Sequence, residues 1–196
     1  MNINVAINTP KLQKLVKALG PTGRKSLNTR AASRLFARVR SHIAGLAATR
    51  HTTAMRLGAT PTGYFEKAAN NTSYAADATT ATVTIRAPGF RRVFGDVRVL
   101  PVAAKALTIP IHPMAYGKRV YELQREGIQI LRPKGKNFLI HPKKDGTFDL
   151  LYVLVASALI RQDRTLLPTD DEMSAEAAQG IRNALSEAMQ QGGSNV

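Results

Sequence analysis

Apolar residues recur at the spacing of an amphipathic helix in three stretches of the chain. The first stretch follows Thr9-Pro10, which suits a helix start, and ends at Gly20-Pro21, which stops a helix. The second stretch predicts a long helix over 28–49. The third predicts a closing helix after Thr169, where Glu172 completes a capping box. Helices are therefore expected near both ends of the chain.

Alternating or β-rich segments elsewhere predict strands. These segments are 2–7, a strand or an extended arm, and 81–86, 96–101 and 107–111. The strongest candidate is the continuous apolar run over 148–160, a pattern typical of a strand that is covered on both faces. Residues 51–63 are predicted to be a loop, 64–70 one or two helical turns, and 90–94 either a helical turn or a strand.

Proline and glycine punctuate residues 110–146, which predicts an excursion from the core. Within it, a short helix is expected over 118–125, and two short strands over 128–131 and 138–141 flank the turn 132–135. Excursions of this length in compact domains are usually functional or mobile.

This order of elements predicts an α+β fold. We expect a small, mainly antiparallel β-sheet packed by a long N-terminal helix and a C-terminal helix, with a hairpin-bearing loop excursion. The length of 196 residues suits a single domain over 1–196 with one buried core. Its parts are an N-terminal arm and short helix over 1–23, the excursion over 110–146 and a flexible tail over 192–196.

Charge is unevenly distributed along the chain, whose formal net charge is +15. Residues 1–60 contain no Asp or Glu, whereas from Thr169 onward five acidic residues accompany a single basic one, Arg182. So basic a surface favours an anionic partner, which is nucleic acid, an acidic protein face or an anionic membrane. The asymmetry also suits head-to-tail contact between copies, and solvation of both faces is the simpler alternative.

Seven basic residues are candidates for contact with DNA or a partner: Arg30, Arg34, Arg38, Arg91, Arg92, Lys134 and Lys136. The first three repeat every four residues on one face of the predicted long helix, where like charges repel slightly. An anionic partner, an intrachain partner or solvent would compensate them. Arg91 and Arg92 are flanked by Phe90 and Phe94, which suits single-stranded nucleic acid. Without a reading motif, phosphate attraction without sequence recognition is expected.

The sequence contains no constellation that indicates catalysis or a cofactor. It has no cysteine, which excludes disulfides and thiolate sites. Segment 20–26 (GPTGRKS) departs from the phosphate-loop spacing and is expected to link two helices. His112 and His141 follow predicted strands and could approach each other, but no acidic residue closely neighbours them in sequence. Neither paired carboxylates in an apolar setting nor a G-x-S-x-G elbow is evident. We therefore expect a non-enzymatic protein without cofactor or metal.

Neither a signal peptide nor a membrane span is expected. Residues 1–7 lack the basic start and the long apolar stretch of a signal peptide. The longest apolar run, over 150–160, is shorter than the roughly 20 residues that cross a bilayer.

Several segments carry a resemblance to a known family: 104–118 (AKALTIPIHPMAYGK), 128–135 (IQILRPKG) and 162–168 (QDRTLLP). Together with the stretch from residue 41, which contains HTTAMRLGA (51–59) and PTGYF (61–65), and with Pro88-Gly89-Phe90, they resemble the virion-morphogenesis family of tailed phages and prophages. The resemblance covers the chain from about residue 30 onward, and its motifs are scaffold motifs with no known chemistry.

The resemblance implies a structural virion protein, a neck or tail-completion subunit at the head–tail junction that is assembled in the host cytoplasm. It implies a homo-oligomeric ring, often of six or twelve copies, on the DNA exit path. The implied partners are other copies of the chain and the adjacent head-closure, connector and tail proteins, with packaged DNA in the lumen as a rival use of the basic residues. The excursion over 110–146 would be an arm that reaches a neighbouring subunit or ring.

Two alternatives remain open. A tail-terminator ring is not separable from a neck ring, because both are small α+β ring proteins. A non-specific nucleic-acid-binding protein that uses the basic N-terminal half would bind phosphate, and this binding would weaken steeply with salt. A ring held by apolar packing would survive the same salt.

Overall fold

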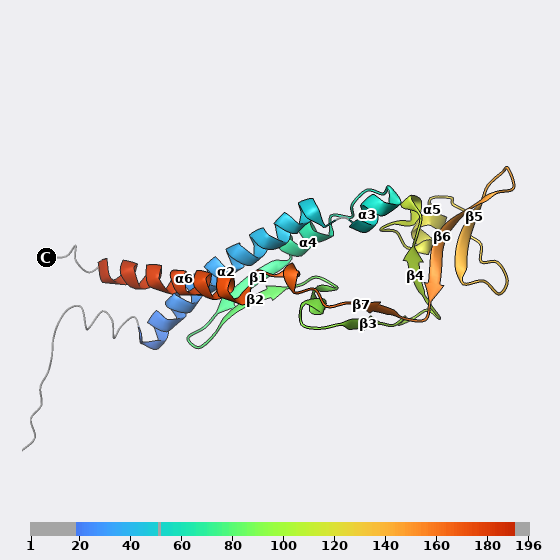
Figure 1. The fold of residues 1–196 in the computed structure, drawn as a ribbon. Helices are drawn as coiled ribbons and strands as arrows, with labels where there is room; N and C mark the ends of the chain where they lie inside the picture. Colours follow the sequence, from blue (N-terminus) through green and yellow to red (C-terminus); the bar gives the residue numbers. More distant parts are fainter. Residues whose placement is uncertain (1–18, 51, 191–196) are drawn as a thin grey trace, which may run out of the picture. The chain divides into compact units, whose positions relative to one another are not determined.

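A computed structural model describes residues 19–50 and 52–190 (Figure 1). The strand or arm over 2–7, nearly all of the helix after Thr9-Pro10 and the tail over 192–196 lie outside these residues and stay predictions, as does the single domain over 1–196. The described chain divides into two compact units. Unit 1 comprises residues 19–44, 66–87 and 165–190, and unit 2 comprises residues 45–65 and 88–164.

The predicted α+β class is confirmed. The long N-terminal helix and the C-terminal helix are both present, and the strands of the described residues form three small antiparallel sheets. The helix predicted over 64–70 is α4 (Tyr64–Asn70). None of the helices in the described ranges has the length and apolar character that a bilayer crossing requires.

Helix α2 (Pro21–Thr49) begins at Pro21 rather than at residue 28. Proline is tolerated in the first turn of a helix, because its missing N–H would have no helical acceptor there. The Arg24 N–H donates to the Gly20 carbonyl at 2.8 Å. Segment 20–26, expected to link two helices, is therefore the start of α2. The buried residues of α2 are Ala31, Ala32, Val39 and Ile43.

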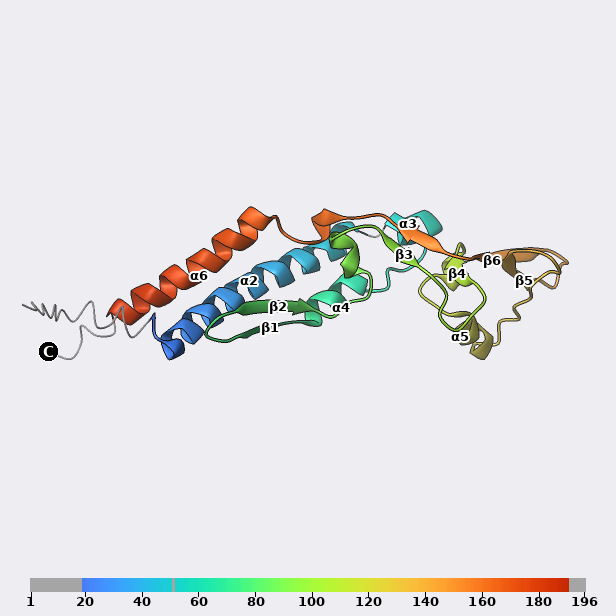
Figure 2. The same ribbon diagram turned by 90° about the horizontal axis from the view of Figure 1, so that it is seen from below.

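In unit 1, α2 lies between α6 (Asp170–Gln190) and a hairpin of β1 (Thr72–Ala76) and β2 (Ala81–Ile85) (Figure 2). Tyr74 of β1 places its ring 5.2 Å from that of Phe36 in α2. The apolar pattern does not predict β1, because its Ser and Ala residues favour strands weakly. Pairing with the predicted strand β2 makes this segment extended.

Unit 2 contains the other two sheets. Strand β3 (Val97–Val99) pairs with β7 (Ala158–Ile160), and the order of the second sheet is β4 (Leu107–Pro110), β6 (Phe148–Val155), β5 (Phe138–Pro142). The single strand predicted over 148–160 is wrong, because the chain leaves one sheet after Val155 and enters the other at Ala158. The prediction that both faces of this strand are covered is also wrong, because Phe148 is 57% exposed and Leu159 is 54% exposed.

The strand predicted over 128–131 is reduced to one bridge between Leu131 and Ile140. Strand β5 instead pairs along its length with β6. Ile128 and Ile130 are turned toward the core and pack against its buried residues, so this segment contributes apolar side chains rather than a ladder.

Unit 2 has a small core built on β6. Its buried members are Ala115, Leu123, Leu151 and Tyr152. Ala115 lies in a 3-10 turn, η2 (Pro113–Ala115), and Leu123 lies in the predicted short helix, α5 (Val120–Arg125). Residues 110–146 therefore supply two of the four buried residues. The predicted loop over 51–63 contains α3 (Thr52–Leu57), whose Ala54 is fully buried.

Candidate functional site

Three of the candidate arginines contact glutamates of α6. The pairs are Arg30 with Glu187 at 2.9 Å, Arg34 with Glu176 at 3.0 Å, and Arg38 with Glu172. We call this set of six side chains the arginine–glutamate ladder. The structure thus brings the basic face of the long helix and the acidic closing helix together within one chain.

The spacing of the ladder follows from two antiparallel helices. Arg34 and Arg38 lie four residues apart on α2, and their partners Glu176 and Glu172 lie four residues apart on α6, in the opposite direction. The next position in this series on α6 is Gly180, which faces Arg30. A Cβ atom at Gly180 would lie 2.7 Å from the Arg30 carbonyl oxygen, so only glycine permits this approach of the two helices.

Arg30 faces a glycine, so it has no glutamate directly opposite. Its guanidinium reaches Glu187, which lies further along α6. The side chains of the ladder are 33–58% exposed. Exposed ion pairs contribute roughly 0.2–1 kcal/mol each. The ladder therefore contributes only modestly to the stability of the unit.

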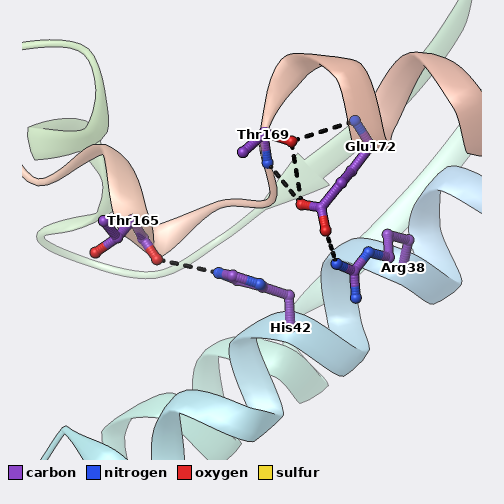
Figure 3. Close-up of polar contacts among 5 residues, drawn as sticks. All are labelled: Arg38, His42, Thr165, Thr169 and Glu172. Atoms are coloured by element: carbon purple, nitrogen blue, oxygen red, sulfur yellow. Dashed lines mark hydrogen bonds and ion pairs between the residues drawn. The ribbon is translucent and has the colours of Figure 1, made fainter.

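Glu172 has two roles at the start of α6 (Figure 3). One carboxylate oxygen accepts the Thr169 N–H at 2.9 Å, while the Thr169 hydroxyl accepts the Glu172 N–H at 3.3 Å. This confirms the predicted capping box. The other oxygen accepts from Arg38. The Thr169 N–H and the Arg38 guanidinium together hold the pKa of Glu172 below its usual value.

His42 lies at the end of the α2 face that carries the ladder arginines. Its Nε2 atom lies 3.0 Å from the carbonyl oxygen of Thr165 (Figure 3). Thr165 is in η3 (Arg164–Leu166), a 3-10 turn that precedes α6 and buries Leu166. The contacts from Arg30 to His42 thus fasten one face of α2 to the C-terminal part of unit 1.

Arg91 and Arg92 lie in η1 (Phe90–Val93), which is a 3-10 turn. The Arg92 guanidinium is 3.8 Å from the Asp163 carboxylate, whereas Arg91 is exposed. Phe90 is buried and stacks on Tyr64 with ring centroids 6.2 Å apart. Of the two phenylalanines that flank these arginines, Phe94 is 82% exposed and remains available to stack on a base. Of the two aromatic rings expected to lie beside the arginines and stack on bases, one is therefore buried by packing within the protein.

A cavity of about 500 Å³ lies beside Arg92 in unit 2. Its lining residues are Arg50, Thr53, Thr62, Tyr64, Phe65, Pro88, Gly89, Arg92, Tyr116, Ile160 and Asp163. Asp163 accepts from Arg50 at 2.6 Å. The Tyr64 hydroxyl donates to the Pro88 carbonyl; burial raises the Tyr64 pKa, and Arg92 opposes that shift. Sequence reasoning missed this cluster, because Arg50 and Asp163 are 113 positions apart.

Lys134 and Lys136 lie in the loop between Leu131 and β5 and are exposed. The loop is closed by hydrogen bonds within it: the Arg132 side-chain Nε–H donates to the Lys136 carbonyl at 3.0 Å, and the Lys136 backbone N–H donates to the Pro133 carbonyl at 3.1 Å. These lysines therefore belong to unit 2, whereas the ladder belongs to unit 1.

The histidines 112 and 141 both influence Asp149. The His112 Nε2 atom lies 3.9 Å from its carboxylate, and Lys143 binds the same oxygen at 2.8 Å. Lys143 lowers the Asp149 pKa most, and both histidines add to the effect. In the parts of the chain that the structure describes, no group of three or more His, Cys, Asp or Glu residues is arranged to hold a metal ion.

The chain was compared with protein-family models, curated proteins and solved structures. None of them matches it.

Proposed function

We propose that this chain is a structural virion protein of a tailed bacteriophage, a subunit of a neck or tail-completion ring that joins the head connector to the tail. The proposal starts from the resemblance carried by 104–118, 128–135 and 162–168. Its partners are further copies of the chain and the adjacent connector and tail proteins. Assembly takes place in the host cytoplasm, and the product is part of the virion.

The observation that carries the proposal is the apolar surface that unit 2 leaves uncovered. Phe94 is 82% exposed, Leu100 is 58% exposed, and Val102 is fully exposed. Large exposed apolar areas mark interaction sites in soluble proteins. A ring subunit covers such side chains with its neighbours, and a heterologous contact closes into a ring when the rotation per subunit allows it.

The nucleic-acid alternative has a narrower basis than the charge of the chain suggests. The arginines at 30, 34 and 38 are paired with glutamates of the same chain, so their contact with DNA stays a prediction and would require those pairs to open. Lys134 and Lys136 have no acidic partner among the described residues, and they support attraction to packaged DNA as an added role. A tail-terminator ring remains the alternative location.

Cryo-electron microscopy of the purified particle tests the proposal. We expect density for this chain in a ring at the head–tail junction, and the level of that ring separates a neck protein from a tail terminator. Absence of the chain from the particle would overturn the proposal.

A salt titration distinguishes the structural ring from the nucleic-acid-binding alternative. We expect binding of the chain to duplex DNA to be weak and to disappear as salt rises from about 50 to 200 mM, because phosphate contacts release counterions. Ring assembly that persists over the same range supports apolar packing between subunits. Tight DNA binding with no assembly would favour the nucleic-acid alternative.

A further inference from the structure

The β5–β6 hairpin carries an exposed apolar face. Paired residues of antiparallel strands point to the same side of a sheet, and the pairs here are Leu131 with Ile140, Ile140 with Leu150, and Pro142 with Phe148. Phe148, Leu131 and Leu150 are 57%, 45% and 36% exposed. We call these five side chains the hairpin face. Ile140 and Pro142, between them, are half-buried.

Basic residues lie at both ends of the hairpin face. Arg132, Lys134 and Lys136 are in the loop before β5, and Lys144 is in the turn after it; Figure 1 shows this loop and this turn at opposite ends of the hairpin. All four are exposed, and none has an ion-pair partner in the described parts of the chain. An apolar centre with a charged rim is the anatomy of a protein–protein interface.

The acidic residues of the chain are largely occupied within it. Ten of the thirteen accept a hydrogen bond or an ion pair inside the described structure: Asp77, Asp96, Glu122, Glu126, Asp145, Asp149, Asp163, Glu172, Glu176 and Glu187. The other three are Glu66 in α4 and Asp170 and Asp171 at the start of α6. A second copy of this chain therefore offers the basic rim little negative surface.

We propose that the hairpin face docks onto a different protein, on a surface that has an apolar centre and an acidic rim. Two copies docked face to face would bring like-charged rims together, which costs binding energy. Nucleic acid would satisfy the rim, but Phe148 is the one aromatic ring of the hairpin face, and its other four side chains offer no surface on which a base can stack. The inference uses this surface alone and does not depend on the ring proposed above.

Photo-crosslinking from the face tests the proposal. The full chain, with p-benzoyl-phenylalanine in place of Leu131, is irradiated in the cells that naturally produce it, and the crosslinked peptides are sequenced by mass spectrometry. We expect a peptide from another protein that contains apolar and acidic residues. Crosslinks to a copy of this chain or to nucleic acid, or no crosslink at all, would overturn the proposal.

Charge reversal then tests the rim. In the variant Lys134→Glu, Lys136→Glu, Lys144→Glu we expect the crosslink yield to fall about tenfold or more, since like charges now face each other. Changing acidic residues of the captured peptide to lysine should restore the yield. The matched control Lys25→Glu, Arg56→Glu, Lys105→Glu changes three exposed cations elsewhere and should keep the original yield. An equal loss in both variants, or no rescue, contradicts docking through the rim.

Discussion

Gly180 of α6 lies against the backbone of Arg30 in α2, so closely that a Cβ atom at position 180 would be 2.7 Å from the Arg30 carbonyl oxygen and 2.9 Å from the Ala31 Cα atom. Both obstacles are backbone atoms of a helix, which do not move aside as a flexible side chain does. The contact fixes how α6 sits on α2 and aligns the ladder beside it.

Gly180→Ala should therefore destabilise the protein by about 1–3 kcal/mol, the usual cost of overpacking, despite the better helix propensity of alanine. Urea unfolding followed by circular dichroism measures this change. The matched control is Gly45→Ala, an exposed glycine in α2 whose Cβ would meet nothing within 4 Å. The control should be neutral or more stable by up to about 1 kcal/mol. Equal effects of the two substitutions would contradict the close helix contact.

Charge reversal of one pair tests the ladder. Arg34→Glu and Glu176→Arg should each lower the free energy of unfolding by about 0.5–1 kcal/mol, because each places like charges across an exposed pair. The double variant should recover most of that loss. A double-mutant cycle by urea unfolding measures the coupling. Additive losses would mean that the pair has no interaction in solution.

Acidification should weaken the start of α6. The folded-state pKa of Glu172 lies below its ordinary value of 4.5, first through the Thr169 N–H and then through Arg38. This group therefore stabilises the fold above pH 4.5, and its contribution is lost as the pH falls through the lower folded-state pKa. We expect the difference in Tm between the native protein and Glu172→Gln to shrink as the pH drops below 4.5. A constant difference would contradict this role.

The buried hydroxyl of Tyr152 should contribute to the core of unit 2. It donates to the Lys118 carbonyl at 3.0 Å, and Tyr152 is only 1% exposed. Tyr152→Phe removes this hydrogen bond and should cost about 0.5–1.5 kcal/mol, the net value of a typical hydrogen bond. Tyr121→Phe is the control, because Tyr121 is 45% exposed, and it should change little. Thermal unfolding of both variants checks the contrast.

The sequence predicted those elements whose signals are carried by residues that are neighbours in the chain. The capping box of Thr169 and Glu172 and the short helix α5 are encoded by neighbouring residues, so the sequence predicts both. The break between β6 and β7 is not encoded in this way, because the run over 148–160 is apolar apart from Asp149 and Ser157 and has no strong breaker residue. Pairing with two different partners, β4 and β3, decides where that run divides.

The candidate site was only partly predictable for the same reason. Periodicity alone aligned the arginines at 30, 34 and 38, and the charge asymmetry pointed to the acidic end of the chain. The sequence left an anionic partner, an intrachain partner, solvent and a neighbouring copy open for these arginines, and the structure shows intrachain pairs. The Arg50–Asp163 contact had no local signal of any kind.

The ladder also determines when unit 1 can be completed during translation. Arg34 and Glu176 are 142 positions apart, so at about 5–20 residues per second the ribosome needs roughly 7–30 s to add α6 after α2 has emerged. During this interval, the arginine face of α2 is without its glutamates. A nascent chain therefore carries this positive face without its glutamates at the time when ribosomal RNA is the nearest polyanion, and the arrival of α6 neutralises it.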